Sequence, residues 1–306
     1  MERGPHTPSG DDPADPATAA FVAHRNLLFT VAYELLGSAA DAEDVLQETW
    51  LRWAAVELGA VRDRRAYLVR IATRQALNRL RAMQRRKEVY VGPWLPEPLR
   101  TAPDMAEDVA FAESVSLALL HILETLGPVE RAVFVLREAF ALGYDEIAAA
   151  VDKSPAAVRQ IAHRAREHVD ARRPREVAAP DETRAALASF QRAVQTGDIP
   201  GLLATLAPEV VLVADGGGVR QAALRPVVGA ERVARLLLSG LGKTPGVFSA
   251  APGTVNGNPA LILRLDGAID GVLAARVEAG RIAGLYYIRN PAKLSRVEVE
   301  TPLTTR

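Results

Sequence analysis

Residues 144–168 read YDEIAAAVDKSPAAVRQIAHRAREH, a stretch that predicts two short helices joined by a tight turn. The first helix is YDEIAAAV. The second begins where Ser154 can cap its N-terminus and Pro155 can occupy its first position. Apolar residues recur at helical spacing in both halves, so each helix has one face that packs against the other. The stretch therefore predicts a helix-turn-helix.

The second helix of this pair carries its polar residues on the face opposite the apolar one. Arginine and glutamine can make paired hydrogen bonds to base edges, and small residues at the helix start allow close approach to a major groove. We therefore predict DNA contacts from Ser154, Ala156, Ala157, Arg159, Gln160, His163 and Arg164. The alternative is an ordinary helical hairpin with a solvated basic face, which the lack of the usual turn glycine favours slightly.

Composition sets outer limits on the function. The 306 residues hold 37 basic and 37 acidic side chains and no cysteine, which excludes disulfides, thiolate catalysis and cysteine-ligated zinc and fits a reducing cytosol. Residues 1–18 are polar and rich in proline, so we expect a disordered segment and no signal peptide. No apolar run approaches the roughly 20 residues of a membrane span. We expect a cytoplasmic protein.

Basic charge is concentrated in one segment. Residues 52–88 hold eleven basic and three acidic side chains, and the helix predicted over 64–87 carries nine cations with Tyr67 and Asn78 between them. Cations follow phosphates, and aromatic or amide groups can contact unpaired bases. A second nucleic-acid contact is therefore favoured over a solvated amphipathic helix.

The preceding stretch, DAEDVLQETWLRW at 41–53, predicts a helix that begins at Asp41 as its N-cap, with acids in the first turn. Its acids lie beside Trp50 and Trp53. Two interpretations are open: a helix with one core face and one solvated acidic face, or a docking surface for a basic protein with the tryptophans as anchors.

The pattern of elements predicts a multidomain protein. Four prolines in YVGPWLPEPLRTAPD at 90–104 predict an extended linker. Helices resume at about residue 106, and from Asp181 one helix is followed by the strands VVLVA, ALILRL, VLAARVE and RIAGLYYIR, with EAGR as a hairpin turn. We expect two all-α domains and one α+β domain, with bounds at 19–88, 106–173 and 181–306 and a linker at 89–105.

Residues 21–173 resemble a bacterial sigma factor of the extracytoplasmic-function (ECF) type. The helix at 41–53 resembles the region 2 helix that binds core RNA polymerase, which implies contacts from Asp41, Asp44, Gln47, Glu48, Trp50 and Trp53. RRAYLVRIATRQALNRLRAMQRRK resembles the segment that melts and reads the −10 element, which implies contacts from Arg64, Arg65, Tyr67, Arg70, Arg74, Asn78, Arg81 and Arg85. Residues 126–167 resemble region 4, whose second helix reads −35. Tyr67 stands where many relatives carry tryptophan.

Three further motifs resemble sigma factors with a fused SnoaL-like C-terminal domain, the SigJ type. They are WLPEP at 94–98, DGGG at 215–218 and NPAKL at 290–294. The resemblance implies a cone-shaped domain that controls the sigma factor in cis and could hold a small apolar ligand. The regulatory residues that it implies are Trp94, Leu95, Pro96, Glu97, Pro98, Asp215, Gly216, Gly217, Gly218, Asn290, Pro291, Lys293 and Leu294. Val219 stands where the family often has lysine.

The glycine run at 216–218 has three interpretations. A phosphate loop needs a helix after the glycines, whereas VRQAAL reads as extended, so nucleotide binding is disfavoured. A plain glycine hairpin or bulge is open. The family favours a loop that lets its backbone approach the WLPEP segment, whose prolines are already extended. A proline-rich ligand for an outside domain competes with that last interpretation.

Catalysis is disfavoured in the C-terminal domain. None of the five histidines lies after residue 168, so the commonest acid–base group is missing. Candidate acid–base groups do remain at Asp198, Asp215, Asp266, Asp270, Tyr286 and Tyr287. We predict a sigma factor that binds core RNA polymerase and promoter DNA and has no catalytic residue, metal, cofactor or membrane contact. The alternatives are a ligand-sensing repressor that acts without polymerase and, more weakly, a SnoaL-type enzyme tethered to DNA.

Overall fold

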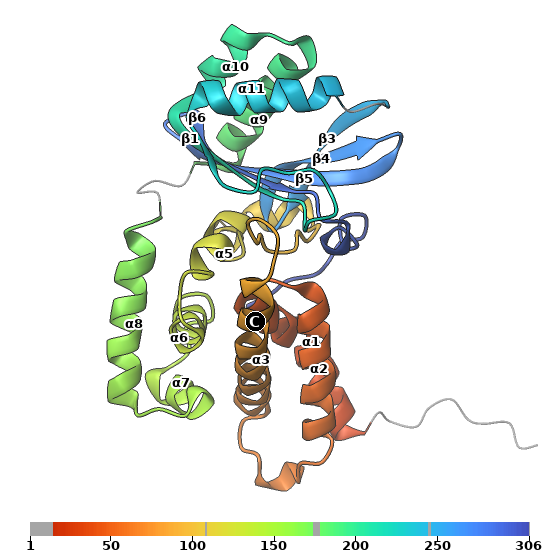
Figure 1. The fold of residues 1–306 in the computed structure, drawn as a ribbon. Helices are drawn as coiled ribbons and strands as arrows, with labels where there is room; N and C mark the ends of the chain where they lie inside the picture. The colour runs from red at the N-terminus through yellow and green to blue at the C-terminus, as the bar shows by residue number, and fades with distance from the viewer. Residues whose placement is uncertain (1–14, 108, 174–177, 244–245, 306) are drawn as a thin grey trace, which may run out of the picture.

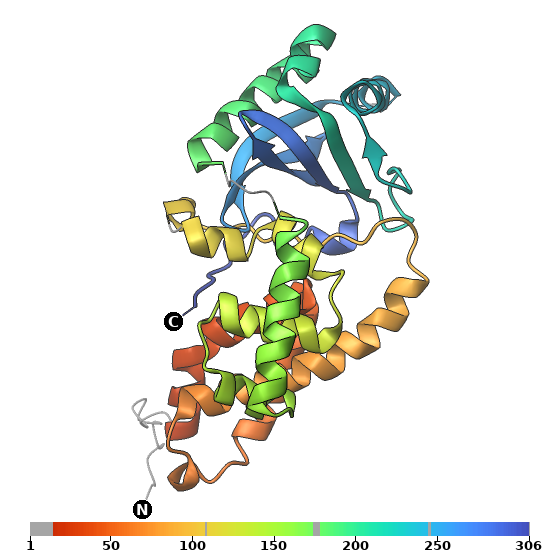
Figure 2. The same cartoon turned by 90° about the vertical axis from the view of Figure 1, so that its left-hand side faces the viewer.

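The computed structural model describes residues 15–107, 109–173, 178–243 and 246–305. A helical half and a sheet capped by helices lie one above the other, and the linker at 89–105, which connects two helices of the helical half, passes between them (Figure 1; Figure 2). The predicted disorder over 1–18 falls mostly outside the described residues. Where it can be compared it is wrong, because α1 begins at Pro16 and Asp15 caps it by accepting from Thr18 N.

The first helical domain consists of α1 (Pro16–Leu36), α2 (Ala39–Trp53), the short η1 (Leu58–Ala60) and α3 (Arg64–Glu88). Gly37 ends α1 with a left-handed φ of 67° that suits glycine. The expected N-cap of the next helix is wrong by three residues. Ser38 caps α2 by accepting from Asp41 N, and Asp41 itself lies in the first turn.

The second helical domain confirms the predicted helix-turn-helix. It contains η2 (Pro103–Glu107), α4 (Val109–Ser114), α5 (Leu117–Leu123), α6 (Pro128–Glu138), α7 (Tyr144–Val151) and α8 (Pro155–Asp170). Ser154 caps α8 by accepting from Ala157 N, with Pro155 in the first turn. Asp152 adopts the left-handed φ of 58° that a glycine would otherwise supply, so the turn forms without one.

The C-terminal domain is α+β, as predicted. Its elements are α9 (Pro180–Thr196), α10 (Ile199–Thr205), β1 (Leu206–Asp215), β2 (Val227–Val228), α11 (Ala230–Lys243), β3 (Phe248–Val255), β4 (Asn258–Leu265), β5 (Ala268–Glu278), β6 (Arg281–Ile288) and η3 (Pro291–Lys293). The sheet order is β2-β1-β6-β5-β4-β3, with β1 parallel to β6 and the other pairs antiparallel. The four predicted strands lie in β1, β4, β5 and β6, and the EAGR turn joins β5 to β6 through Ala279 and Gly280, both at positive φ.

The two faces of the sheet pack against different partners. Helices α9, α10 and α11 cover one face and bury Phe190, Leu212, Leu273 and Leu285. The opposite face packs Val213, Val272 and Ile288 against Leu95 of the linker and Leu117 of α5. Both helical domains share a single buried core that runs from α1 to α8. The linker is therefore enclosed between the sheet and the helical half.

Candidate functional site

A buried ion pair holds the middle of the linker. Asp215, at the end of β1, is 0% exposed, and Lys293 of η3 is 6% exposed. Lys293 Nζ lies 2.7 Å from Asp215 Oδ2 and donates to Leu95 O at 2.6 Å, while Leu95 N donates to the same Asp215 oxygen at 2.9 Å. The C-terminal domain thus binds both backbone polar groups of Leu95. These bonds bring together the DGGG, NPAKL and WLPEP motifs, which contain Asp215, Lys293 and Leu95.

Two aromatic rings complete this pair. Lys293 Nζ lies 3.4 Å from the centroid of the Trp94 ring, and Tyr90 packs edge-on against Trp94 at 4.7 Å. Tyr90 OH donates to Asp215 Oδ1 at 2.5 Å and accepts from Asn290 Nδ2 at 2.7 Å. Burial lowers the pKa of Lys293 to about 8, although the Asp215 charge opposes that shift. Sequence reasoning did not identify Tyr90.

The glycines let the backbone approach these groups closely. A Cβ on Gly217, whose φ is 62°, would stand 2.4 Å from Asn290 Nδ2, and one on Gly218 would stand 3.2 Å from Val91. Gly217 N also donates to Asp215 Oδ1 at 3.1 Å. The run is therefore a close-approach loop, but its glycines lie against Asn290 and Val91 and not against the WLPEP segment itself.

The second half of the WLPEP segment binds the first helical domain. Glu97 N donates to Gly37 O at 2.8 Å, and Tyr33 OH donates to Glu97 O at 2.6 Å. The Glu97 carboxylate accepts from Ala39 N at 2.7 Å, at the N-terminus of α2, where the helix dipole favours an anion. Burial raises the pKa of Glu97, while these backbone donors oppose the rise. Pro96 and Pro98 are buried with it.

Asn256 joins three parts of the chain and was not predicted. Its Nδ2 donates to Tyr33 OH at 2.7 Å and to Val115 O at 2.9 Å, and its Oδ1 accepts from Leu99 N at 2.9 Å. It lies in the turn between β3 and β4, with a φ of 51° and no exposed surface. The Asn256–Gly257 dipeptide is a hairpin signal in the sequence, and this signal could have located the turn.

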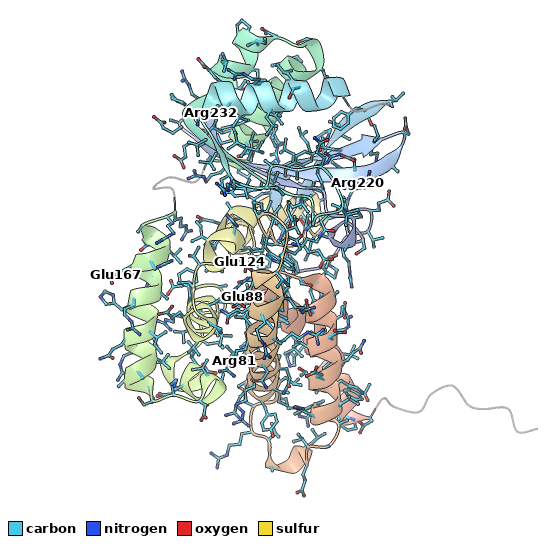
Figure 3. The ribbon with its side chains drawn as sticks, in the orientation of Figure 1. Arg81, Glu88, Glu124, Glu167, Arg220 and Arg232 are labelled. Carbon is cyan, nitrogen blue, oxygen red and sulfur yellow. The ribbon has the colours of Figure 1, made fainter. Side chains whose placement is uncertain are left out.

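A second buried ionic cluster joins the two helical domains. Arg131 of α6, which is 1% exposed, donates twice to Glu34 O of α1, at 2.9 and 3.1 Å, and pairs with Glu124 at 2.7 Å. Glu124 also pairs with Lys87 of α3, and it lies where α3 meets the second helical domain (Figure 3). Burial alone would raise the pKa of Glu124, but the Arg131 and Lys87 charges hold it at about 2.

The face of α8 that we predict to read DNA is open. Arg159, Gln160, His163 and Arg164 are exposed, whereas Val158 is buried on the inner face of the helix. Ala156 is exposed and Ala157 is half-buried at the helix start, so neither blocks an approach to this end. Glu167 marks the same outer side of α8 in Figure 3.

The predicted −10 face on α3 is partly covered. Arg64, Asn78, Arg81 and Arg85 are exposed and extend from the helix, as Arg81 does in Figure 3. Arg74 is exposed as well but donates to Ala149 O of α7 at 3.1 Å, and the half-buried Arg65 donates to Thr305 O at 3.3 Å. Tyr67 is half-buried and packs against Trp53 with the Arg70 guanidinium 4.5 Å above its ring.

The predicted polymerase-binding set on α2 is wrong for Trp53. That side chain is 0% exposed, and its indole N–H donates to Ala17 O at 2.8 Å, so it belongs to the core. Asp41 is also buried and pairs with Arg79 and Arg86 of α3. Trp50 is half-buried against Phe21. Gln47 and Glu48 remain exposed, and Asp44 is half-exposed beside Arg79.

The C-terminal domain offers little that resembles a catalytic centre. Asp270 pairs with Arg289 at 2.9 Å and accepts from Tyr287 OH at 3.2 Å, and Asp198 caps α10. Within the described ranges, no cluster of three or more histidine, aspartate or glutamate side chains could hold a metal ion. No helix among all the residues that the structure describes is long and apolar enough to cross a membrane.

Known proteins resemble this chain over nearly its whole length. Residues 20–86 match Sigma-70 region 2, and residues 116–169 match Sigma-70, region 4. The chain is 36% identical over 289 residues to the ECF RNA polymerase sigma factor SigJ of Mycobacterium tuberculosis, covering 90% of this chain and 92% of that protein. It is 34% identical over 289 residues to the probable ECF RNA polymerase sigma factor SigI of the same organism, covering 94% and 97%.

A solved structure shows the same overall arrangement. The crystal structure of Mycobacterium tuberculosis extracytoplasmic function sigma factor SigJ superposes on this chain with a TM-score of 0.74 at 33% identity. The superposition covers 94% of this chain and 99% of that one, so it includes the helical domains, the linker and the sheet domain together.

Proposed function

Because the chain belongs to the ECF RNA polymerase sigma factors, we propose that its C-terminal domain controls promoter binding in cis by clamping the linker between regions 2 and 4. Region 2 is the domain of α1 to α3, and region 4 is the domain of α4 to α8. As a sigma factor, the protein binds core RNA polymerase and promoter DNA and directs initiation. This membership excludes the alternative of a repressor that acts without polymerase.

The clamped arrangement does not fit a promoter. By their numbering, the −35 and −10 elements lie about 25 base pairs apart, roughly 85 Å along B-DNA at about 3.4 Å per base pair. Region 4 instead lies directly on region 2, with α7 against α3 and Arg74 Nη2 3.1 Å from Ala149 O. Released and extended, the linker at 89–105 could span roughly 55 Å, at about 3.3 Å per residue. Opening would therefore let each region reach its own element.

One observation carries the proposal: the C-terminal domain binds both the backbone N–H and the backbone C=O of Leu95. We call the two side chains that do so, Asp215 and Lys293, the clamp. Asp215 accepts from Leu95 N and Lys293 donates to Leu95 O. Both side chains are buried, so water does not compete for these hydrogen bonds. The linker cannot extend while these bonds hold. Release of Leu95 frees this part of the linker, and regions 2 and 4 can then separate once the Arg131–Glu34 and Lys87–Glu124 contacts between them also break.

Of the residues that the sequence predicts to contact DNA or polymerase, we propose exposed ones as the contacts. We assign −35 recognition to Arg159, Gln160, His163 and Arg164, which are exposed on α8. The exposed residues of α3 that we assign to −10 are Arg64, Asn78, Arg81 and Arg85. Gln47 and Glu48 are the exposed residues of α2 that we assign to core polymerase.

A small apolar ligand in the C-terminal domain stays a prediction, as does the absence of catalysis. Leu187, Phe190, Val233, Leu261 and Leu273 fill the space between the sheet and its helices. A ligand in that space would have to displace some of these side chains. Ligand binding would then shift the strands of the sheet, including β1 with Asp215 at its end, and could in this way weaken the bonds to Leu95.

Substitution of Asp215 by asparagine tests the clamp. Asp215→Asn removes the charge that pairs with Lys293, so we expect about tenfold more promoter-dependent transcript with core RNA polymerase, since a hydrogen bond to a charged group is worth about 1.5–3 kcal/mol. Asp198→Asn is the matched control, because Asp198 is exposed in the same domain. Equal yields from Asp215→Asn and the parent would refute the clamp.

A further inference from the structure

Residues 294–305 leave the C-terminal domain and run back to region 2 (Figure 1; Figure 2). Along the way they pair with the chain beyond the WLPEP segment. Arg100 N donates to Arg296 O at 3.3 Å, and Thr301 N donates to Arg100 O at 2.8 Å. Arg296 also bonds to Glu43 Oε1 of α2 at 3.2 Å. This path takes residues 301–305 past the linker and onto the helices of region 2.

Residues 301–305 dock on α1 and α3. Leu303 packs against the core that the two helical domains share, and Thr304 N donates to Thr30 Oγ1 at 3.0 Å. Thr305 O accepts from Arg65 Nη2 at 3.3 Å. Thr30 is fully buried in α1, and its hydroxyl donates to Asn26 O at 2.8 Å while it accepts from the docked segment, so this buried polar group is satisfied.

Arg65 gives this docking a functional consequence. It stands in the first turn of α3, among the cations that we predict to bind promoter DNA, and its guanidinium donates to the backbone of the segment instead. An N–H that donates to a carbonyl cannot donate to a phosphate at the same time. We propose that residues 301–305 form a strap that occupies the Arg65 side of region 2 and competes there with single-stranded promoter DNA.

The strap's bonds are suited to reversible docking. Its contacts with region 2 include one neutral hydrogen bond, one bond to an arginine and one apolar side chain, and none of these is a buried ion pair. The strap is also separate from the clamp, because it contacts neither Asp215 nor Lys293. This inference rests on the proposed function, since it assumes that Arg65 contacts DNA.

Two variants of the full chain test the strap. Leu303→Asp places a charge where the strap packs on the core, whereas Val299→Asp makes the same change at a side chain that is 68% exposed. Binding of a fluorescein-labelled single-stranded DNA of 12 mixed-sequence nucleotides is measured by anisotropy. We expect Leu303→Asp to bind about three- to tenfold tighter than the parent, as for the release of one hydrogen bond of ordinary strength. Val299→Asp should match the parent.

The added charge cannot explain the expected gain, because an extra acid weakens DNA binding. Thr304→Pro, which removes the N–H that binds Thr30 and adds no charge, should also tighten DNA binding. Arg65→Ala should then weaken DNA binding more in the Leu303→Asp background than in the parent, where the strap already occupies Arg65. Equal affinities for Leu303→Asp and Val299→Asp, or an equal effect of Arg65→Ala in both backgrounds, would overturn the strap.

The outcomes also separate the strap from the clamp. Tighter DNA binding by Leu303→Asp, with no change in transcript from Asp215→Asn, would support the strap and refute the clamp. The reverse pattern would refute the strap alone. No DNA binding by the parent or any variant would overturn the role of Arg65 and with it the competition.

Discussion

Replacement of Lys293 by methionine probes the clamp at one atom. Lys293 Nζ is 2.7 Å from Asp215 Oδ2, 2.6 Å from Leu95 O and 3.4 Å from the centroid of the Trp94 ring. Methionine keeps an unbranched apolar side chain against Trp94 but loses the charge and its donors. Asp215 is then buried without a cation, and the loss of one partner from a buried pair costs about 3–5 kcal/mol.

Urea unfolding measures this cost. Lys293→Met should lower the free energy of unfolding of the C-terminal domain by about 3–5 kcal/mol at pH 7. The double variant Asp215→Asn with Lys293→Met should be less destabilised than the sum of the two single variants, by at least about 1 kcal/mol, because it leaves no unpaired charge. Lys153→Met, at an exposed lysine in the turn before α8, should stay within about 0.5 kcal/mol of the parent.

Either of two results would refute this reasoning. A Lys293→Met variant as stable as Lys153→Met would mean that the Asp215 charge does not depend on Lys293. Strict additivity in the double variant would mean that the two side chains are not coupled, and the bonds to Leu95 would then be incidental.

Three other predictions concern the remaining contacts. Arg159→Ala or Arg164→Ala should weaken promoter binding by about 1–3 kcal/mol in a gel-shift titration, and unchanged affinity would remove α8 from the −35 contact. Trp94→Ala should change transcript yield without changing promoter preference, because Trp94 contacts Lys293 and no predicted DNA residue; equal yield would count against a regulatory linker. The parent should lose stability as pH falls from about 4.5 to about 2, because Glu124 has a pKa near 2 when folded and is stabilising only while ionised. Glu124→Gln should lose less over that window in urea unfolding at pH 5 and pH 3, and an identical loss would rule Glu124 out as its source.

Local signals predicted the elements that local chemistry determines. Ser154 and Pro155 located the start of α8 because a cap and a first-turn proline act within one helix. β3 was missed because Pro252 and Gly253 interrupt it, and this is tolerated since β3 lies at the edge of the sheet. Trp53 was wrongly assigned to the surface because its burial depends on helix packing and not on local sequence. Acids and tryptophans at helical spacing do not reveal which face of α2 packs against α1 and α3.

For the contacts between the C-terminal domain and the linker, the sequence predicted the motifs involved but not which atoms bond to each other. Asp215, Gly217 and Lys293 lie in motifs that the sequence identifies, and the structure brings all three to the linker. Tyr33 lies in no motif, and the Asn256–Gly257 hairpin signal predicts a turn but not its partners. Their roles depend on a hydrogen bond across 223 residues of sequence, which only the tertiary fold creates.

The central claim is that regions 2 and 4 are held together and must separate. The chain has no cysteine, so Ala23→Cys on α1 and Asp170→Cys on α8, both at exposed positions, would carry the only two spin labels. Their separation is then measured by pulsed electron paramagnetic resonance with and without core RNA polymerase. The clamp predicts one narrow distribution of distances in the free protein, a partial shift to longer distances for Asp215→Asn, and a distance longer by tens of ångströms on polymerase, roughly as the −35 to −10 spacing requires. The same distribution on polymerase as in the free protein, with promoter-dependent transcription intact, would contradict it.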